Sequence, residues 1–492
     1  MRYHYPEYAV RLTPELLAQC RELAQRLLED VGLRVRSQGF VRALRTQSGV
    51  TVDGDRVRLS HALTDKFLDA YAETNRKALL AKRPRQGPGD AWSLRTNGYS
   101  IMVIDVETDQ VRPATRQDLR DLIRLVRSFG MGGSYPCTPQ DVPPLMRALE
   151  CFRICWQESD NIKPFDYMDI RQTPYLLEMH RVMGKPFVIN VNIPHAMTIS
   201  EHDIDIFLKY YPVWKRNHAE IGFYSICDYP MLGVCKPITA TGCLASYLAQ
   251  SFGAYMLFKL FDPEVEMLPR LSAGMPVDLR TMCWAYGSPR RHLYDYLNSQ
   301  ALPALCGLTP FDYLPESGSL DTGSCAVDAR AGMEKMASAL VAAMQGARVF
   351  CGAGNLAVDD LFSGVQLVID VEIFEYVKEV VRSFSPHPDI VTLDGLYDVL
   401  RDTALGAEEF YSHPDTASKV RSLLPVSPRR PHEKLRSWLE HGQNMKDRAR
   451  EECLERIRNQ PPYTLDEHKR RELDNICARA EKELAGQEAG AV

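Results

Sequence analysis

Residues 223–262 read FYSICDYPMLGVCKPITATGCLASYLAQSFGAYMLFKLFD, and this stretch decides the fold class. Its first residues form a short apolar run typical of a buried strand. Pro230, Gly233 and Pro237 then interrupt any regular element. The Ala, Leu and Tyr spacing that follows is typical of a helix. A strand, a long loop and a helix in this order predict a βα unit, in which the loop after the strand usually carries function.

The same alternation of short apolar runs and amphipathic helices recurs about seven or eight times over roughly 270 residues. This rhythm fits a (β/α)8 barrel, and it also fits a doubly wound open sheet. No Gly-x-Gly-x-x-Gly follows a strand candidate, which counts weakly against a dinucleotide-binding fold. We therefore predict an α/β protein with a (β/α)8 TIM barrel and helical additions at both ends.

Shifts in composition divide the chain into three regions. Residues 1–94 predict helices around a hairpin that turns at Asp53-Gly54, and they close with a Pro/Gly linker. Residues 95–426 carry the barrel pattern, with one helix expected to begin at Thr115. Residues 427–492 are charged helices with a sparse apolar stripe, which we expect to pack on the barrel or on a second subunit.

The overall composition is that of an ordinary globular protein of 492 residues with a formal net charge of −5. No basic stripe suggests nucleic-acid binding. The first residues show neither a signal-peptide core nor a transit pattern. No apolar run approaches the roughly 20 residues that span a bilayer. We expect a cytoplasmic protein that binds neither nucleic acid nor a membrane.

The 13 cysteines include no Cys-x-x-Cys pair, and several lie inside apolar patterns. This usage indicates reduced thiols, so we expect no disulfide and no structural zinc. Cys137, Cys151 and Cys155 could imitate a metal site. Small buried apolar side chains on one helix face are the favoured interpretation, and no metal ligand set is predicted.

Six stretches stand in order between about residues 10 and 475. They are VRPATRQDLRDLIRLV, NIKPF, GVCKPITATGCLASYLAQ, MPVDLRTMCWAYGSPRRHL, ARVFCGAGNLAVDDLFSGVQLVIDVEIFEYV and FYSHPDTASKVRSLL. Together they resemble motifs of the trimethylamine:corrinoid methyltransferases, a family that includes members without pyrrolysine that demethylate quaternary amines such as glycine betaine. The resemblance implies a barrel that binds a methylated amine at its mouth. It also implies a separate corrinoid (cobalamin-bearing) protein whose Co(I) accepts the methyl group, with no cofactor bound tightly by this chain.

Three departures from the family pattern bear on the substrate. Ser324, Cys325 and Ala326 stand where related members carry pyrrolysine, so a quaternary amine fits better than a tertiary one. Arg290 replaces the acid of a Gly-Ser-Pro-Glu stretch. Lys236 stands before Pro237 where glycine is expected, and its cation could repel a cationic substrate or hold its carboxylate.

A trimethylammonium group offers no hydrogen bond and is held by aromatic faces and negative charge. Candidate aromatic walls at strand ends are Tyr135, Phe165, Phe223, Tyr224, Tyr229, Trp284 and Phe362. For any one of them, core packing is the alternative interpretation. As a set they predict an aromatic cage.

Acidic side chains at the mouth would complement the cation. Asp228 follows the strand of the opening stretch, and Asp321 precedes Ser324 in its loop. A betaine carboxylate would need donors, for which we expect Asn355 and His413, both in positions similar to family motifs. For Asn355 a turn residue is the equal alternative, and for His413 the alternative is a residue that only fixes a loop.

The loop of the opening stretch is predicted to face the substrate and the corrinoid protein, through Gly233, Lys236, Thr239 and Thr241. A rigid βα connection without ligand contact is the alternative. We expect methyl transfer from a betaine-type quaternary amine, by a homo-oligomer. Two other classes stay open: a non-catalytic relative that binds a methylated amine or the corrinoid protein, and a barrel hydrolase or lyase, for which no His-x-His or His-Glu-x-x-His is present.

Overall fold

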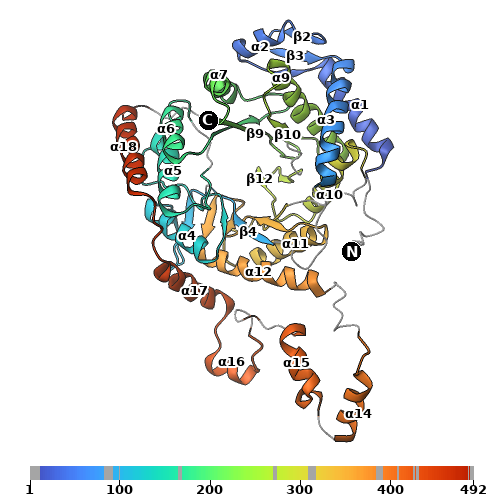
Figure 1. Ribbon diagram of the computed structural model, residues 1–492, viewed down its shortest axis with the longest axis vertical. Coiled ribbons are helices and arrows are strands. Elements are labelled where there is room, and N and C mark those ends of the chain that lie inside the picture. Colours follow the sequence, from blue (N-terminus) through green and yellow to red (C-terminus); the bar gives the residue numbers. More distant parts are fainter. Residues whose placement is uncertain are drawn as a thin grey trace.

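The computed structural model describes residues 12–81, 92–98, 100–164, 169–269, 274–308, 317–383, 392–406, 409–424, 427, 431–485 and 487. In Figure 1 the central strands lie inside a shell of helices. Phe165 and most of the predicted linker lie outside the described residues. No helix in the described part of the chain has the length and apolar content needed to cross a membrane.

The N-terminal residues form helices around a small antiparallel sheet, as predicted. Helix α1 (Pro14–Asp30) begins after Thr13, whose hydroxyl accepts a hydrogen bond from the Leu16 amide. Strands β2 (Val50–Asp53) and β3 (Arg56–Leu59) pair antiparallel through a turn that holds Gly54 at a φ of +59°. The remaining elements are β1 (Leu33–Arg34), α2 (Gln38–Leu44) and α3 (His61–Ala81).

Four short parallel strands form one arc of the central sheet. Their order is β13 (Ser317–Ser319), β14 (Val349–Cys351), β4 (Ser93–Thr96) and β7 (Gly132–Gly133). A parallel bridge from Gly133 to Ile162 extends the arc by one position. Because a Cβ on Gly133 would lie 2.3 Å from the Thr96 carbonyl oxygen, β7 approaches β4 only as glycine. The helices around this arc are α4 (Arg116–Ser128), α5 (Arg147–Glu158) and α11 (Ala329–Met344).

A second arc contains the stretch that decided the fold class. Its parallel strands run in the order β8 (Phe187–Ile193), β9 (Ile221–Asp228) and β10 (Leu268–Pro269). After β9 the chain forms the predicted loop and then helix α8 (Ala240–Tyr247), a π-helical turn η2 (Leu248–Phe252) and α9 (Gly253–Phe261). The helices that flank this arc are α6 (Thr173–Met183), α7 (Glu201–Arg216) and α10 (Arg291–Leu305).

Two further groups of strands lie in connections that begin at the carboxyl ends of the arcs. Strands β5 (Met102–Ile104) and β6 (Val111–Pro113) follow β4, and β15 (Asn355–Leu356) and β16 (Leu361–Ser363) follow β14. They join into one sheet in the order β15-β16-β5-β6. The hairpin of β11 (Val277–Asp278) and β12 (Cys283–Trp284) follows β10.

The predicted alternation of parallel strands with helices is confirmed. Within the described ranges the strands form two parallel arcs, with no strand pairing between Ile162 and β8 or between β10 and β13. Residues 165–168, 270–273 and 309–316, which precede these junctions or lie in them, fall outside the description. The arcs therefore establish a parallel α/β sheet without establishing a closed barrel.

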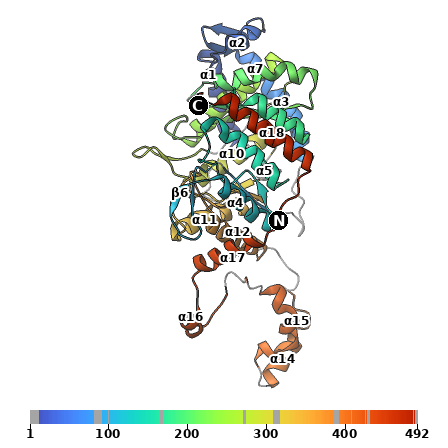
Figure 2. The same ribbon diagram turned by 90° about the vertical axis from the view of Figure 1, so that its left-hand side faces the viewer.

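The C-terminal helices α17 (Met445–Asn459) and α18 (Glu467–Leu484) pack on the helices around the strands, whereas the elements between α12 (Gly364–Ser383) and α17 project away from them. Helix α17 buries Cys453 against α12, and α18 packs beside α6. Between α12 and α17, the described elements are α14 (Leu396–Gly406), η3 (Phe410–Ser412), α15 (Pro414–Leu423) and α16 (Leu435–His441). Both Figure 1 and Figure 2 show these elements projecting beyond α17.

Candidate functional site

The candidate site lies at the carboxyl ends of the parallel strands. The loops after β9, β13 and β14 all start at this end of their arcs, because every pairing within an arc is parallel. Active sites of repeated βα architectures are built from such loops. A salt bridge from Arg291 at the start of α10 to Asp321 after β13 links the connections of the two arcs.

A buried ion pair closes the loop after β9. The Lys236 ammonium nitrogen lies 2.5 Å from a carboxylate oxygen of Asp228, and neither side chain is exposed. The same ammonium stands 4.6 Å from the centre of the Tyr247 ring. The other Asp228 oxygen accepts a hydrogen bond of 3.3 Å from the Ser251 hydroxyl, which the π-helical turn presents.

Burial acts on both members of this pair. Desolvation raises the pKa of Asp228 to about 6 although Lys236 opposes the shift. Desolvation likewise lowers the pKa of Lys236, and Asp228 opposes that shift. The expectation that Lys236 could repel or bind a substrate presumed a free cation, whereas in the structure the Lys236 ammonium is paired with the Asp228 carboxylate. The two side chains together present a neutral group.

A second charged cluster joins α10 to the end of β13. Arg291 forms ion pairs with Asp321 and with Asp295, and it donates to the Ser319 hydroxyl at 3.0 Å. Its guanidinium lies 5.5 Å from the centre of the Tyr286 ring. Asp321, predicted as a partner for the substrate cation, is thus already held by an arginine of this chain.

A third buried pair supports the turn after β14. The Lys335 ammonium donates to Asp370 at 2.7 Å and to the Gly352 carbonyl at 3.1 Å. The same Asp370 oxygen accepts the Gly354 amide at 2.7 Å. Helices α11 and α12 therefore fix both ends of the Gly352–Gly354 turn, and Asn355 follows directly.

Asn355 is 4 % exposed, and its side-chain oxygen is a free acceptor among the described residues. Its amide nitrogen donates to the Asn97 carbonyl at 2.5 Å, while its side-chain oxygen has no hydrogen-bond partner among the described residues. A buried polar atom without a partner is uncommon and marks a position of interest. The predicted role of donor to a carboxylate would use the second N–H of the same amide nitrogen, because the first is donated to Asn97.

The loop that contains Ser324–Ala326 is held from two sides. On one side, Glu334 accepts hydrogen bonds from the Thr322 hydroxyl and the Gly323 amide. On the other, the tip of the β15–β16 hairpin donates its Ala357 and Val358 amides to carbonyls of the loop at 2.6 and 3.0 Å. Ala357 and Val358 have φ of +48° and +73°, a strained conformation for a β-branched residue. The exposed Cys325 is therefore carried on a rigid support.

The predicted aromatic walls belong to different parts of the molecule. Phe223 packs against Phe207 and Trp214 of α7, which places it on the helical side of β9. Tyr135 and Phe362 are fully buried in the core around β4 and β14. The side chain of Tyr224 lies outside the described part. The structure does not bring these rings into one cage.

Trp284 remains at the rim of the site. It is half-buried on the β11–β12 hairpin, and its ring meets that of Tyr286 edge to face with centres 5.5 Å apart. Because Tyr286 also lies beside Arg291, this aromatic pair borders the cluster at the end of β13. Trp284 is thus a predicted wall whose ring contact lies at this rim.

His413 lies apart from the strand ends. It caps helix α15, where its ring nitrogen accepts the Asp415 amide at 3.1 Å, and α15 belongs to the projecting part of the chain (Figure 1). The described contacts of His413 are those of a loop-fixing residue, the alternative raised by its position before Pro414.

The other predicted residues of the loop after β9, which are Gly233, Thr239 and Thr241, are exposed. Gly233 has a φ of +83°, and a Cβ there would lie 3.3 Å from both Ile238 and Leu279. Thr239 caps α8 by accepting the Gly242 amide, and the Thr241 carbonyl accepts from the Cys20 thiol. The loop therefore contacts the β11–β12 hairpin and presents Gly233, Thr239 and Thr241 at the surface.

Six residues of these clusters have no role predicted from the sequence. They are Tyr247, Ser251, Arg291, Ser319, Glu334 and Lys335. Lys335 offers a signal in retrospect, because it shares one face of α11 with the buried Ala331, Ser338 and Ala339. A lysine on a buried helix face requires a counter-charge.

Two observations concern metals and thiols. All 13 cysteines are free thiols, and burial raises the pKa of Cys155, which disfavours its reactive thiolate form. Within the described ranges, no group of three or more His, Cys, Asp or Glu side chains is arranged to hold a metal ion.

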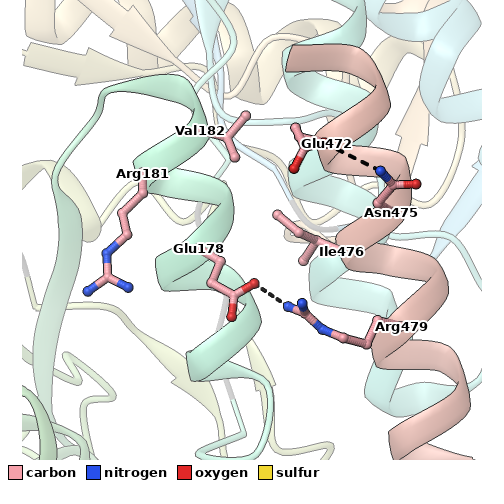
Figure 3. Close-up of a pocket in the computed structure, with 7 residues that line it drawn as sticks. All are labelled: Glu178, Arg181, Val182, Glu472, Asn475, Ile476 and Arg479. Carbon is pink, nitrogen blue, oxygen red and sulfur yellow. Dashed lines mark hydrogen bonds and ion pairs between the residues drawn. The ribbon is translucent and has the colours of Figure 1, made fainter. Parts of the chain in front are cut away.

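A surface pocket lies elsewhere, between α6 and α18 (Figure 3). Its volume is about 500 Å³, and its walls include Val182 and Ile476. Arg479 forms an ion pair with Glu178 across it, and Asn475 bonds Glu472. The pocket is a seam between two outer helices, remote from the loops after the strands.

Comparison with known proteins gives a consistent result. The family model described as trimethylamine methyltransferase (MTTB) matches residues 1–485. The chain is 22% identical over 478 residues to the trimethylamine methyltransferase MttB of Desulfitobacterium hafniense, covering 93% of this chain and 91% of that protein. It is 27% identical over 177 residues to MttB of Methanosarcina barkeri, covering 36% and 34% of the two chains.

Proposed function

The chain belongs to the trimethylamine methyltransferase family, and from that premise we propose that it transfers a methyl group from a betaine-type quaternary amine to a separate corrinoid protein. Methyl transfer is the activity of the family. The finer assignment, to a quaternary amine and a corrinoid acceptor, is our proposal. It rests on the charges at the strand ends.

The observation that carries the proposal is the pairing of those charges. Asp228, Asp321 and Asp370 are each held by a cation of the same chain, namely Lys236, Arg291 and Lys335. A neutral tertiary amine must first be made cationic by an acid or an electrophile, because its leaving group would otherwise be an amide anion. A quaternary amine is already cationic and leaves as a neutral tertiary amine, so no proton moves and no free acid is needed. Paired carboxylates suit the second case.

The reaction itself is a displacement at carbon. The partner's corrinoid would supply the electron pair that forms the new bond to the methyl carbon, and the pair of the breaking C–N bond stays on nitrogen. Atoms and charge then balance without an acid or a base. What this chain must do is bind the ammonium, direct one methyl group outward and exclude water.

Trp284 and Tyr286 are the side chains best placed to bind the ammonium. Their rings meet at the rim, and an aromatic face contributes about 0.5–2 kcal/mol to a desolvated cation. The orphaned oxygen of Asn355 adds partial negative charge. These groups bind a cation without transferring a proton.

This chain has an exposed apolar surface at the same end, which suits docking of a partner protein. Val234 and Ile238 on the loop after β9, and Leu279 and Met282 on the hairpin, are 43–66% exposed. Gly233 brings the two segments together. Apolar side chains gathered on a rim support docking of a protein over the site.

We also propose that the two parallel arcs close into a barrel. The eight strand positions follow the order of a (β/α)8 fold, namely β4, β7, Ile162, β8, β9, β10, β13 and β14.

The test is formation of the methylated corrinoid, followed by absorbance, from the purified chain and a reduced corrinoid protein. The substrates are glycine betaine, proline betaine, carnitine, choline and trimethylamine. We expect turnover with a carboxylate-bearing quaternary amine. Turnover of trimethylamine alone would contradict the proposal, and so would no turnover with a competent acceptor, which is the result expected of a binding-only relative.

Variants separate binding from docking. Trp284→Ala should raise the KM for the amine roughly tenfold, the effect of losing about 1–2 kcal/mol. Trp438→Ala, a tryptophan on α16, is the matched control. Ile238→Asp should raise the concentration of corrinoid protein needed for half-maximal rate and leave the KM for the amine unchanged, whereas Met333→Asp on α11 should change neither.

A further inference from the structure

Exposed apolar side chains are concentrated in the projecting segment, which we call the arm (residues 393–445). Of 25 large apolar residues that are exposed in the described structure, 13 lie in the arm. They are Leu393, Leu396, Tyr397, Leu400, Leu405, Phe410, Tyr411, Val420, Leu424, Leu435, Trp438, Leu439 and Met445. Monomeric proteins rarely expose so much contiguous apolar surface.

The arm helices lack a core of their own. Helices α15 and α16 contain no buried residue, and α14 contains only Thr403. They are 11, 10 and 7 residues long, shorter than the roughly 12–15 residues at which isolated helices become even marginally stable. Their stability must come from packing against another surface.

The apolar residues follow helical faces. Leu396, Leu400 and Thr403 are spaced by four and three positions on α14. On α16, Trp438 and Leu439 stand three and four positions after Leu435, so each set shares one helical face. Figure 2 shows the arm directed away from the helices that cover the strands. The body surface nearest its root is already covered, because α17 packs on α12 there.

The charge of the arm identifies the partner. Residues 393–415 contain six acidic residues and one basic residue, and residues 416–441 contain six basic and two acidic residues. The described ion pairs, such as Arg401 with Asp398 and Lys419 with Asp415, join neighbours on one helix. An acidic half followed by a basic half is complementary to itself under two-fold symmetry.

We propose that the arm is the interface between two copies of this chain, with the acidic half of each arm against the basic half of the other. The apolar side chains and their polar neighbours supply about the 20–30 residues per side of a standard interface. The interface lies outside the site after the strands and does not depend on the proposed reaction.

The first test is the mass of the full chain by light scattering after gel filtration at micromolar concentration. We expect the wild type to be a dimer or a multiple of one. Leu400→Glu combined with Trp438→Glu should halve that mass. Met333→Glu, at an exposed apolar residue of α11, is the matched control and should not change it. Circular dichroism checks that each variant is folded.

The second test uses charge reversal. Asp398→Lys with Asp402→Lys reduces the net charge of residues 393–415 from −5 to −1, and Lys419→Glu with Arg421→Glu reduces that of residues 416–441 from +4 to 0. Each double variant alone should be at least tenfold weaker in self-association. An equimolar mixture should associate more strongly than either variant alone, because the unchanged basic half of one variant meets the unchanged acidic half of the other. A monomeric wild type would overturn the proposal, as would arm variants that keep the wild-type mass or a mixture that does not associate.

Discussion

Replacing Lys236 by methionine tests the interpretation of the buried pair most directly. Methionine keeps the length of the side chain and its contact with Tyr247, but it removes the ammonium 2.5 Å from Asp228. Among the described residues, Asp228 then keeps one hydrogen-bond partner, the Ser251 hydroxyl at 3.3 Å, in a site where it is 2 % exposed. An uncompensated buried charge of this kind costs about 3–5 kcal/mol.

The free-energy cost of the unpaired Asp228 carboxylate has an upper limit that depends on pH. Asp228 escapes the penalty by taking up a proton, and neutralising a carboxyl of ordinary pKa 3.8 at pH 7 costs about 4 kcal/mol. At pH 5 the same step costs about 2 kcal/mol. Lys236→Met should therefore lower the free energy of unfolding by about 3–4 kcal/mol at pH 7, and by no more than about 2 kcal/mol at pH 5.

The measurement is urea denaturation followed by fluorescence at both pH values. Adding Asp228→Asn to Lys236→Met should recover most of the loss, because an amide needs no counter-charge. Arg280→Met, which breaks the exposed pair with Asp278, is the control and should change stability by less than about 1 kcal/mol. A loss below 1 kcal/mol at pH 7, or a loss equal at the two pH values, would refute the reasoning.

Three further predictions concern other positions. Burial lowers the pKa of His180 to about 4 from 6.5, so the unfolded chain binds more protons than the folded chain between these pH values. The free energy of unfolding should therefore fall by up to about 3 kcal/mol as the pH drops from 6.5 to 4. His180→Phe should flatten this part of the plot of stability against pH. Lys335→Met should release the Gly352–Gly354 turn from Asp370 and cost about 3–5 kcal/mol in urea denaturation, and a loss under 1 kcal/mol would contradict its supporting role. Val358→Gly should remove strain at φ +73° and raise the melting temperature by the equivalent of about 1 kcal/mol, whereas Val365→Gly in helix α12 should lower it.

The sequence was sufficient for elements whose causes are local. Thr115 begins α4 with a full capping box, as its position before Arg116 and Asp118 indicates. The hairpin at Gly54 and the strand, loop and helix from residue 221 to 261 have equally local signals. Helix caps and tight turns depend on residues within four positions, so a single sequence contains the information.

Side-chain direction at the strand ends could not be predicted in the same way. Phe223 faces the helices, and beyond it the pairing of β9 with β8 shifts register between Ile189 and Val191. One position of register exchanges the two faces of a strand, so the sequence alone does not fix which side chains at its end face the site. The pairing of Lys236 with Asp228 depends on the path of a loop through Gly233 in a left-handed conformation. His413 resembles a family motif, yet the arm carries it away from the strands.

The π-helical turn between α8 and α9 has a consequence for how this region can change. A turn with one residue more than an α-helical turn shifts the angular phase of everything after it by about 100°. Upstream of η2 the phase turns Tyr247 toward Lys236, and downstream it turns Leu257 and Phe258 into the core. Deleting one residue between 248 and 252 would rotate one of these faces out of position. The extra residue of the π-helical turn thus sets the angle between the helix face near the loop and the helix face in the core. Substitutions on one face can therefore be accommodated without changing the direction of the other.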